Sequence, residues 1–120
     1  MNNQFSNKLF DIGRAIKTSS GGADPTLRTE IASYAGMLTL DPATSAEQIP
    51  EELRPYITKV VKHAYKTTDH DIEQLKAAGY SEDELYELTI SAAFGAGYAR
   101  YQQGLALLNE NSANQIVEVP

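Results

Sequence analysis

The chain has 120 residues, of which 42% are hydrophobic, and this is enough for one domain with a single ordinary core. Ten Lys and Arg residues against 16 Asp and Glu residues give a net charge of -6, which argues against nucleic acid and anionic membrane surfaces as partners. The chain has no cysteine, which excludes disulfides, thiolate metal sites and thiol-based redox chemistry.

No run of residues approaches the roughly 18 apolar residues of a membrane span. The start of the chain, MNNQFSNKLF, lacks the basic segment and the continuous apolar segment of a signal peptide. We therefore expect a cytoplasmic protein without a membrane span, in which residues 1–120 form a single domain.

Two helices are predicted in the N-terminal part of the chain. The segment NKLFDIGRAIK places Leu9, Ile12 and Ile16 on one side of a helix. Asp24 and Pro25 are a good N-cap and first residue for the second helix, DPTLRTEIASYAGML. The loop TSSGGA lies between these two helices, and the loop DPATSAEQIP follows the second. The first loop is a connector, because it lacks the lysine and the preceding strand of a phosphate-binding loop.

Two shorter helices are predicted on either side of a histidine-bearing joint, HAYKTTDHD. The first, PYITKVVKHAYK, has Pro55 at a natural first helical position. Its residues at helical apolar spacing are Tyr56, Val60, Val61 and Ala64. Thr68 caps the second, DHDIEQLKAAG, which has an acidic first turn and an apolar side formed by Ile72 and Leu75.

The strongest helical pattern is SEDELYELTISAAFGAGYARYQQGLALL. Gly79 suits the end of the preceding helix, and Ser81 with Glu84 has the spacing of a capping box, so a helix of about 27 residues is predicted from Ser81. Gly95 and Gly97 each cost about 1 kcal/mol in a helix interior, and close approach of another helix is the expected compensation. The predicted apolar stripe consists of Leu85, Leu88, Ala92, Ala96, Ala99 and Leu105 or Leu107, thickened by Tyr86, Phe94, Tyr98 and Tyr101.

Convincing β alternation occurs only in NQIVEV, within the predicted tail at residues 109–120. An arm, an edge strand and a disordered tail all fit this segment. The predicted fold class is all-α.

The histidine-bearing joint followed by LKAAGYSEDELYELTISAAFGAGYARYQQGLALL resembles the carboxymuconolactone decarboxylase and alkylhydroperoxidase D-like family, over roughly residues 50–108. The resemblance implies an AhpD-like helical bundle that assembles into homo-oligomers, either trimers or hexamers.

The peroxidase branch of this family carries a Glu and, after a spacer, the motif Cys-x-His-Cys-x-x-x-His. One register places these positions on Glu51, His63, Tyr65, Lys66 and His70. A register shifted by one uses Glu52, Ala64, Lys66, Thr67 and Asp71 instead. Neither register contains a cysteine, so thiol peroxidase activity is excluded, because no sulfenic acid or disulfide intermediate can form.

The resemblance is therefore closer to the cysteine-free members, which decarboxylate a small carboxylated lactone without metal or organic cofactor. Such a reaction needs groups that hold the carboxylate and an acid that protonates the carbanion left by carbon dioxide. Histidine suits the acid role, because its ordinary pKa lies near 6.5. The resulting candidates are His63, His70 and Glu51 as catalytic residues, and Tyr65, Lys66 and Arg100 as substrate-binding residues.

Each main candidate also has a structural explanation. His70 belongs to an exposed first helical turn, His63 complements the negative end of the preceding helix, and Glu51 suits a position before a helix start. A metal site is disfavoured, because a helix break would separate the two histidines.

Two functions therefore stay open: a cofactor-independent lyase, and a non-catalytic oligomeric binding or interaction module on the same fold. A buried His63 favours the enzyme. An apolar groove with exposed histidines favours the module.

Overall fold

The computed structural model describes residues 3–118, with side chains described for residues 7–110. Its described α-helices are α1 (Asn3–Thr18), α2 (Pro25–Leu40), α3 (Arg54–Lys62), α4 (Asp69–Ala77) and α5 (Glu82–Glu118). Two 3-10 turns, η1 (Glu51–Leu53) and η2 (Ala64–Lys66), flank α3. No strand occurs within residues 3–118, so the predicted all-α class is confirmed.

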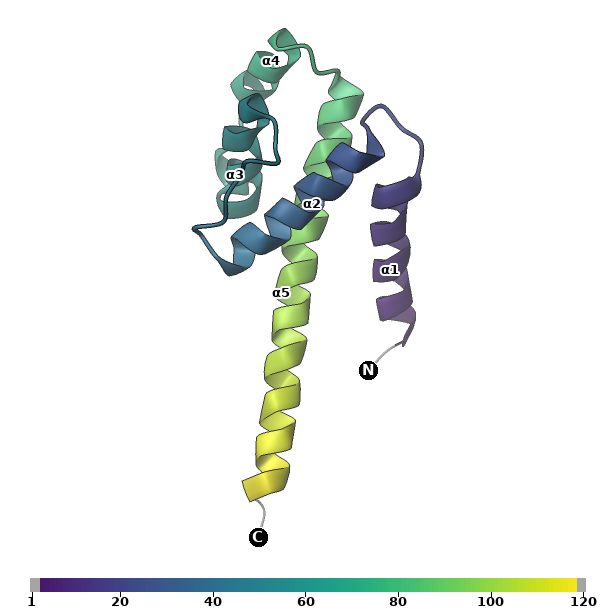
Figure 1. Cartoon of the computed structure of the whole chain (residues 1–120), viewed down its shortest axis with the longest axis vertical. Helices are drawn as coiled ribbons and strands as arrows, with labels where there is room; N and C mark the ends of the chain where they lie inside the picture. Colours follow the sequence, from purple (N-terminus) through teal and green to yellow (C-terminus); the bar gives the residue numbers. More distant parts are fainter. Residues whose placement is uncertain (1–2, 119–120) are drawn as a thin grey trace.

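The helices are arranged around α5, which is the longest element (Figure 1). α2 crosses the first half of α5, α3 and α4 lie on one side of this crossing, and α1 lies on the other. The second half of α5 extends away from the other helices, which gives the molecule dimensions of 65 × 29 × 24 Å. Its radius of gyration is 17.0 Å, against roughly 14 Å for a compact chain of this length. None of the described helices is both long and apolar enough to cross a bilayer.

The core lies where α2 packs against α5. Gly95 makes this crossing close, because a Cβ atom there would overlap the backbone of Ala32 on α2. The predicted close approach at Gly95 is confirmed, whereas a Cβ at Gly97 would meet no described atom within 4 Å outside its own helix. The core residues include Ile31, Tyr34, Ala35, Leu38, Ile49, Leu53, Tyr56, Ile57, Val61, Leu75, Leu85, Leu88, Ala92 and Ala96.

The predicted caps position the last two helices. Ser81 and Glu84 exchange hydrogen bonds between side chain and backbone N–H at 3.0 and 3.1 Å, so α5 begins at the next residue after its predicted cap. Thr68 and Asp71 form the same reciprocal arrangement at the start of α4. Gly79, with φ 111°, adopts the left-handed conformation that ends α4. Asp24 likewise accepts a hydrogen bond from a backbone N–H at the start of α2.

The predicted end of α5 is wrong. This helix has 37 residues and continues to Glu118, so NQIVEV is helical over its described part, and residue 119 lies outside the described residues. The physical reason is that residues 105–119 contain neither glycine nor proline, so no local signal stops the helix.

Some predicted apolar positions do not reach the core. Ile12 is 46% exposed and Tyr86 is 68% exposed, although both were assigned to the apolar sides of their helices. Leu107 is also exposed, whereas Leu105 is half-buried. Spacing defines the faces of a helix, but the neighbouring helices decide which face is covered.

Candidate functional site

Four of the predicted site residues lie at the C-terminal end of α3. His63 is the C-cap of α3, and Tyr65 and Lys66 belong to η2 directly after it. The rings of His63 and Tyr65 meet edge to face with centroids 6.0 Å apart, and Lys66 Nζ lies 5.9 Å from the Tyr65 ring centroid. Arg100 approaches from α5 and donates a hydrogen bond to the carbonyl oxygen of Val61 at 3.3 Å. The fold therefore brings these four residues to one region.

This region is an open surface. His63, Lys66 and Arg100 are exposed, and Tyr65 is 81% exposed. Water therefore surrounds the groups that would hold a carboxylate or donate a proton. Catalytic electrostatics are strongest where water is excluded, and a single copy of the chain does not exclude it here.

The other two predicted catalytic residues lie elsewhere on the surface. His70 is exposed in the first turn of α4, beside the acidic residues of that turn. Glu51 is exposed in η1, before the start of α3. The whole of α3, nine residues and about 13 Å long, lies between Glu51 and His63. The fold thus places the candidate catalytic residues Glu51 and His63 at opposite ends of α3.

Two carboxylates of the shifted register hold neighbouring segments together. Glu52 accepts a hydrogen bond of 2.7 Å from the Tyr80 hydroxyl, which lowers the pKa of Glu52. Burial, reinforced by Glu52, raises the pKa of Tyr80 to about 12. Asp71 binds Lys59 Nζ at 2.9 Å and accepts the Thr68 N–H, which lowers the pKa of Asp71. Both carboxylates are therefore ionised near neutral pH, and each one joins two neighbouring segments of the chain.

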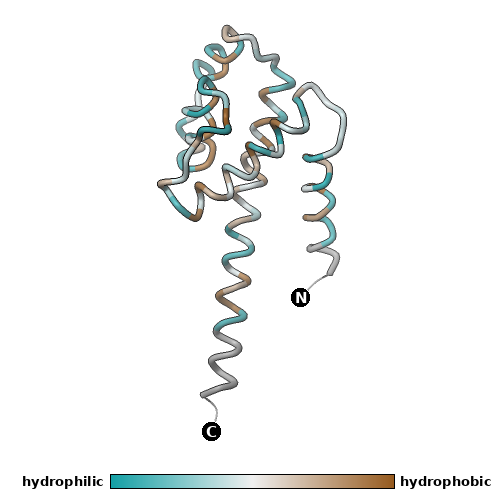
Figure 2. Tube along the Cα trace, viewed as in Figure 1, coloured by the Kyte–Doolittle hydropathy of each residue, from teal (hydrophilic) through white to brown (hydrophobic). Residues whose placement is uncertain are grey.

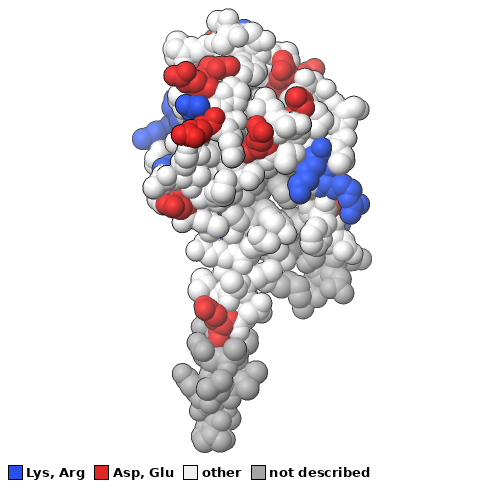
Figure 3. Space-filling model, viewed as in Figure 1, with Lys and Arg blue, Asp and Glu red and all other residues white. Residues whose placement is uncertain are grey.

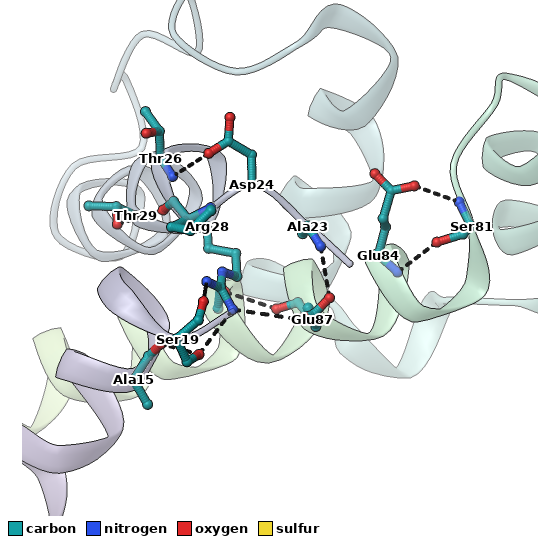
Figure 4. Close-up of polar contacts among 12 residues, drawn as sticks. Ala15, Ser19, Ala23, Asp24, Thr26, Arg28, Thr29, Ser81, Glu84 and Glu87 are labelled. Atoms are coloured by element: carbon teal, nitrogen blue, oxygen red, sulfur yellow. Dashed lines mark hydrogen bonds and ion pairs between the residues drawn. The ribbon is translucent and has the colours of Figure 1, made fainter. Parts of the chain in front are cut away.

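A largely buried ion pair, absent from the sequence expectations, joins α2, α5 and the loop after α1 (Figure 4). Arg28 on α2 is 4% exposed, and its Nη1 lies 3.4 Å from Glu87 Oε1 on α5. The Arg28 guanidinium also donates to the carbonyl oxygen of Ser19, just after the end of α1. Glu87 accepts the Ala23 N–H at 2.9 Å, so one carboxylate holds both Arg28 and the loop between α1 and α2. Arg28 Nε is buried and has no hydrogen-bond partner among the described residues.

A groove of about 730 Å³ lies between α1, α2 and α5 and is here named the α1–α5 groove. Gly36 and Gly95 at the helix crossing form part of its wall, and the rings of Phe94 and Tyr98 stack at 5.6 Å along α5. Its apolar lining consists of Leu9, Phe10, Gly13, Ile16, Ala32, Gly36, Met37, Leu40, Phe94, Gly95, Tyr98 and Ala99. Several of these side chains are open to solvent, including Phe10 at 61% and Leu40 at 57%.

An apolar row on α5 continues from this groove along the part of the helix that leaves the other elements. We name it the α5 seam; it consists of Phe94, Tyr98, Tyr101, Leu105 and Leu108. Successive members are four, three, four and three residues apart, the spacing of a coiled-coil contact row. Figure 2 shows hydrophobic residues on both α1 and this extended part of α5. Leu108, the far end of the seam, is 63% exposed.

A second hollow of about 480 Å³ lies between α3, α4 and the start of α5. Its lining residues are Tyr56, Asp69, Ile72, Glu73, Glu82, Leu85, Tyr86 and Thr89. The Tyr56 hydroxyl and Thr89 Oγ1 are hydrogen-bonded to each other at 2.7 Å. Neither predicted histidine lines this hollow or the α1–α5 groove. Within the described residues, no three His, Asp or Glu side chains are grouped to hold a metal ion.

Comparisons of the chain with protein-family models, with curated proteins and with solved structures found no match. The resemblance to the carboxymuconolactone decarboxylase family therefore stays a prediction. The α1–α5 groove was not predicted, because its residues come from three separate helices. The α5 seam had a signal in the sequence: its three- and four-residue steps continue beyond Ala99, where the buried stripe ends.

Proposed function

We propose that the chain is a self-assembling helical module, in which a second copy covers the α1–α5 groove and the α5 seam. The observation that carries this proposal is the seam itself, which continues from the groove onto a stretch of α5 that extends away from the other helices (Figure 1). An isolated stretch of helix is marginally stable in water. A partner that packs along the seam supplies the missing tertiary contacts.

The exposed apolar side chains support the same proposal. Phe10, Met37, Leu40 and Leu108 are each between 45% and 63% exposed, and the first three line one groove. A continuous apolar surface rimmed by polar groups is typical of an interaction site. The exposure of both histidines, His63 at the end of α3 and His70 in the first turn of α4, also favours a module over an enzyme.

The charge of the chain favours this surface for contact between copies. Two chains of net charge -6 repel each other over most of their surfaces. Between Arg100 and Glu110, however, α5 has no charged residue. Figure 3 shows an uncharged surface along α5 below the other helices, ended by one acidic group. Two copies meet there with little electrostatic cost.

Size-exclusion chromatography with light scattering tests the proposal. The unaltered chain is expected to form an oligomer, and Leu108→Lys is expected to shift it to the monomer, because the substitution buries a charge in the seam. Leu107→Lys is the matched control, because Leu107 is a neighbouring exposed leucine outside the seam. A monomeric unaltered chain at every concentration contradicts the proposal, as does an equal effect of the two substitutions.

We propose cofactor-free decarboxylation of a small carboxylated lactone as the second candidate. It is favoured by the position of Arg100, which approaches the His63 end of α3 from α5. In the reaction the bond from carbon to the carboxylate breaks and carbon dioxide leaves. The electron pair left on carbon takes a proton from His63, and water returns the proton to the imidazole. Arg100 and Lys66 hold the carboxylate before it leaves.

Carbon dioxide release from a panel of small carboxylated lactones tests this second candidate. His63→Gln is expected to abolish turnover, whereas His70→Gln, on the exposed first turn of α4, serves as the matched control and retains it. Binding of the lactone without turnover in His63→Gln would separate the proton donor from the anion site. Absence of release by the unaltered chain rules out decarboxylation of the lactones tested.

A further inference from the structure

We infer that the two copies pair their α5 helices antiparallel, so that the far end of each α5 enters the α1–α5 groove of the other copy. This inference rests on the self-assembly proposed above and names its geometry. The second copy then completes a four-helix bundle made of α1 and α5 from each chain. Such bundles bury contact rows with three- and four-residue spacing between helices.

The α5 seam matches itself when one helix is reversed. Tyr98 then lies opposite Leu108 of the partner subunit, and Tyr101 lies opposite Leu105 of the partner subunit, with both pairs repeated by symmetry. Each layer combines an aromatic ring with a leucine. Identical patches that pair reciprocally are characteristic of a two-fold dimer.

The antiparallel pairing of Tyr98 with Leu108 of the partner subunit also places the partner's helix in the α1–α5 groove. Tyr98 and Phe94 line the α1–α5 groove together with Leu9 and Phe10 of α1. Because Leu108 of the partner subunit lies opposite Tyr98, the next turns of the partner's helix enter this groove. One occupant therefore covers both the exposed seam and the exposed groove side chains.

The area available also favours this arrangement over contact along the seam alone. The seam spans 15 residues, about 20 Å of helix, and a helix about 10 Å wide leaves a footprint of roughly 200 Å². A stable interface needs about 800 Å² from each partner. Contacts of the inserted helix with α1 and α2 in the groove supply additional area.

Charge favours the antiparallel direction. The first turn of α5 contains Glu82, Asp83 and Glu84. A parallel pair would place this acidic turn beside its own copy, where like charges repel. The antiparallel pair puts the two acidic turns at opposite ends of the assembly, more than a Debye length apart.

Engineered cysteines test the geometry without interference, because the chain has no native cysteine. Tyr98→Cys and Leu108→Cys are prepared separately, unfolded, refolded together and oxidised. The antiparallel pair is expected to give a disulfide between Cys at 98 and Cys at 108 in the mixture. Either variant alone is expected to give none, because identical positions lie about 15 Å apart along the bundle, beyond the roughly 7 Å reach of a disulfide.

A third cysteine variant keeps the inference testable if Tyr98→Cys or Leu108→Cys does not fold. Gln102 is exposed and flanks the centre of the antiparallel pair. Gln102→Cys is therefore expected to cross-link with itself, whereas in a parallel pair the two positions lie on opposite sides of the contact. Circular dichroism of each reduced variant shows that it is helical before oxidation.

The outcomes separate this inference from the proposed function. Self-cross-linking of Tyr98→Cys and of Leu108→Cys indicates a parallel pair and overturns the inference alone. The inference is also overturned if the oligomer is not a dimer. It is likewise overturned if the oligomer forms neither the mixed disulfide nor the Gln102→Cys disulfide. If the unaltered chain is monomeric, both the proposed self-assembly and the antiparallel geometry inferred from it are overturned.

Discussion

Asp71 shows how a single carboxylate joins two helices. It accepts the Thr68 N–H at the start of α4 and binds Lys59 on α3. These donors favour the charged form, and they lower the pKa of Asp71 from its ordinary value near 3.8. Ionisation of this carboxyl group and folding of the α3–α4 region therefore stabilise each other.

The stability of the chain is expected to depend on this ionisation in acid. Because the folded pKa of Asp71 is lowered, its contribution is complete above the ordinary value near 3.8 and is lost as the pH falls through the folded pKa. Urea unfolding between about pH 5 and pH 2 measures this loss. Asp71→Asn is expected to remove part of the slope, leaving the part due to Glu52. An unchanged slope in Asp71→Asn would contradict this link between ionisation and folding.

The ion pair between Arg28 and Glu87 is also expected to contribute to stability. Glu87→Gln leaves the buried Arg28 cation without a carboxylate, and removal of one partner of a buried pair costs about 3 kcal/mol. Arg14→Gln is the control, because Arg14 and Asp11 are 73% and 72% exposed and such pairs contribute less than about 1 kcal/mol. The free energy of unfolding in urea compares the two. Similar losses for both variants would show that the buried pair has no special role.

At the scale of elements, the crossing of α2 and α5 positions every other helix. α2 approaches so closely at Gly95 that its Ala32 backbone occupies the space of a side chain. The crossing places Gly36 and Gly95 in the wall of the α1–α5 groove. The same contact therefore forms the core and shapes the proposed interface.

Gly95→Ala is expected to destabilise the chain by about 2 kcal/mol or more, because the added methyl group pushes two backbones apart. Gly97→Ala is expected to stabilise it by about 0.5–1 kcal/mol, since alanine favours the helix and its Cβ has open space. The two glycines are on the same helix, two residues apart. Chemical unfolding of both variants at one protein concentration checks the opposite signs. If Gly95→Ala is tolerated like Gly97→Ala, the close approach of α2 is wrong.

At the scale of the whole molecule, the length of α5 is the feature that bears on assembly. The core involves the first half of α5, while the second half adds an apolar seam without adding to that core. A larger core would need contacts that a single chain of this shape does not make. In the proposed assembly a second copy provides these contacts, and the stability of the fold is then expected to depend on assembly.

The melting temperature is therefore expected to rise with protein concentration, because association stabilises only the folded chain. Leu108→Lys, which places a charge in the seam, is expected to remove this dependence. Leu107→Lys is expected to keep it. Thermal scans of the three proteins over a series of dilutions measure the effect, and a melting temperature of the unaltered chain that does not change with dilution would contradict self-assembly.

Local signals in the sequence predicted where several helices begin. Asp24, Thr68 and Ser81 each cap a helix through a bond to a backbone N–H two or three residues further along. Such bonds depend on neighbouring residues alone, so the sequence contains all the information needed. The end of α5 could not be read in this way, because no stop signal exists there.

The candidate site was predicted only in part. The joint after α3 is where the sequence indicated it, but α3 ends at Lys62 with His63 as its C-cap, whereas the predicted helix continued to Lys66. The packing of α3 against α5 decides whether His63 is buried. It also decides whether Glu51 or Arg100 lies beside His63. Helical spacing does not contain that information.

The sequence by itself therefore determined the all-α class, the helix caps and the exclusion of thiol chemistry, because each follows from residue types and short spacings. The tertiary structure alone decided that the histidines face water and that Leu9, Met37 and Tyr98 meet in one groove. These residues are far apart in the chain, and only the close crossing of α2 over Gly95 brings their helices together.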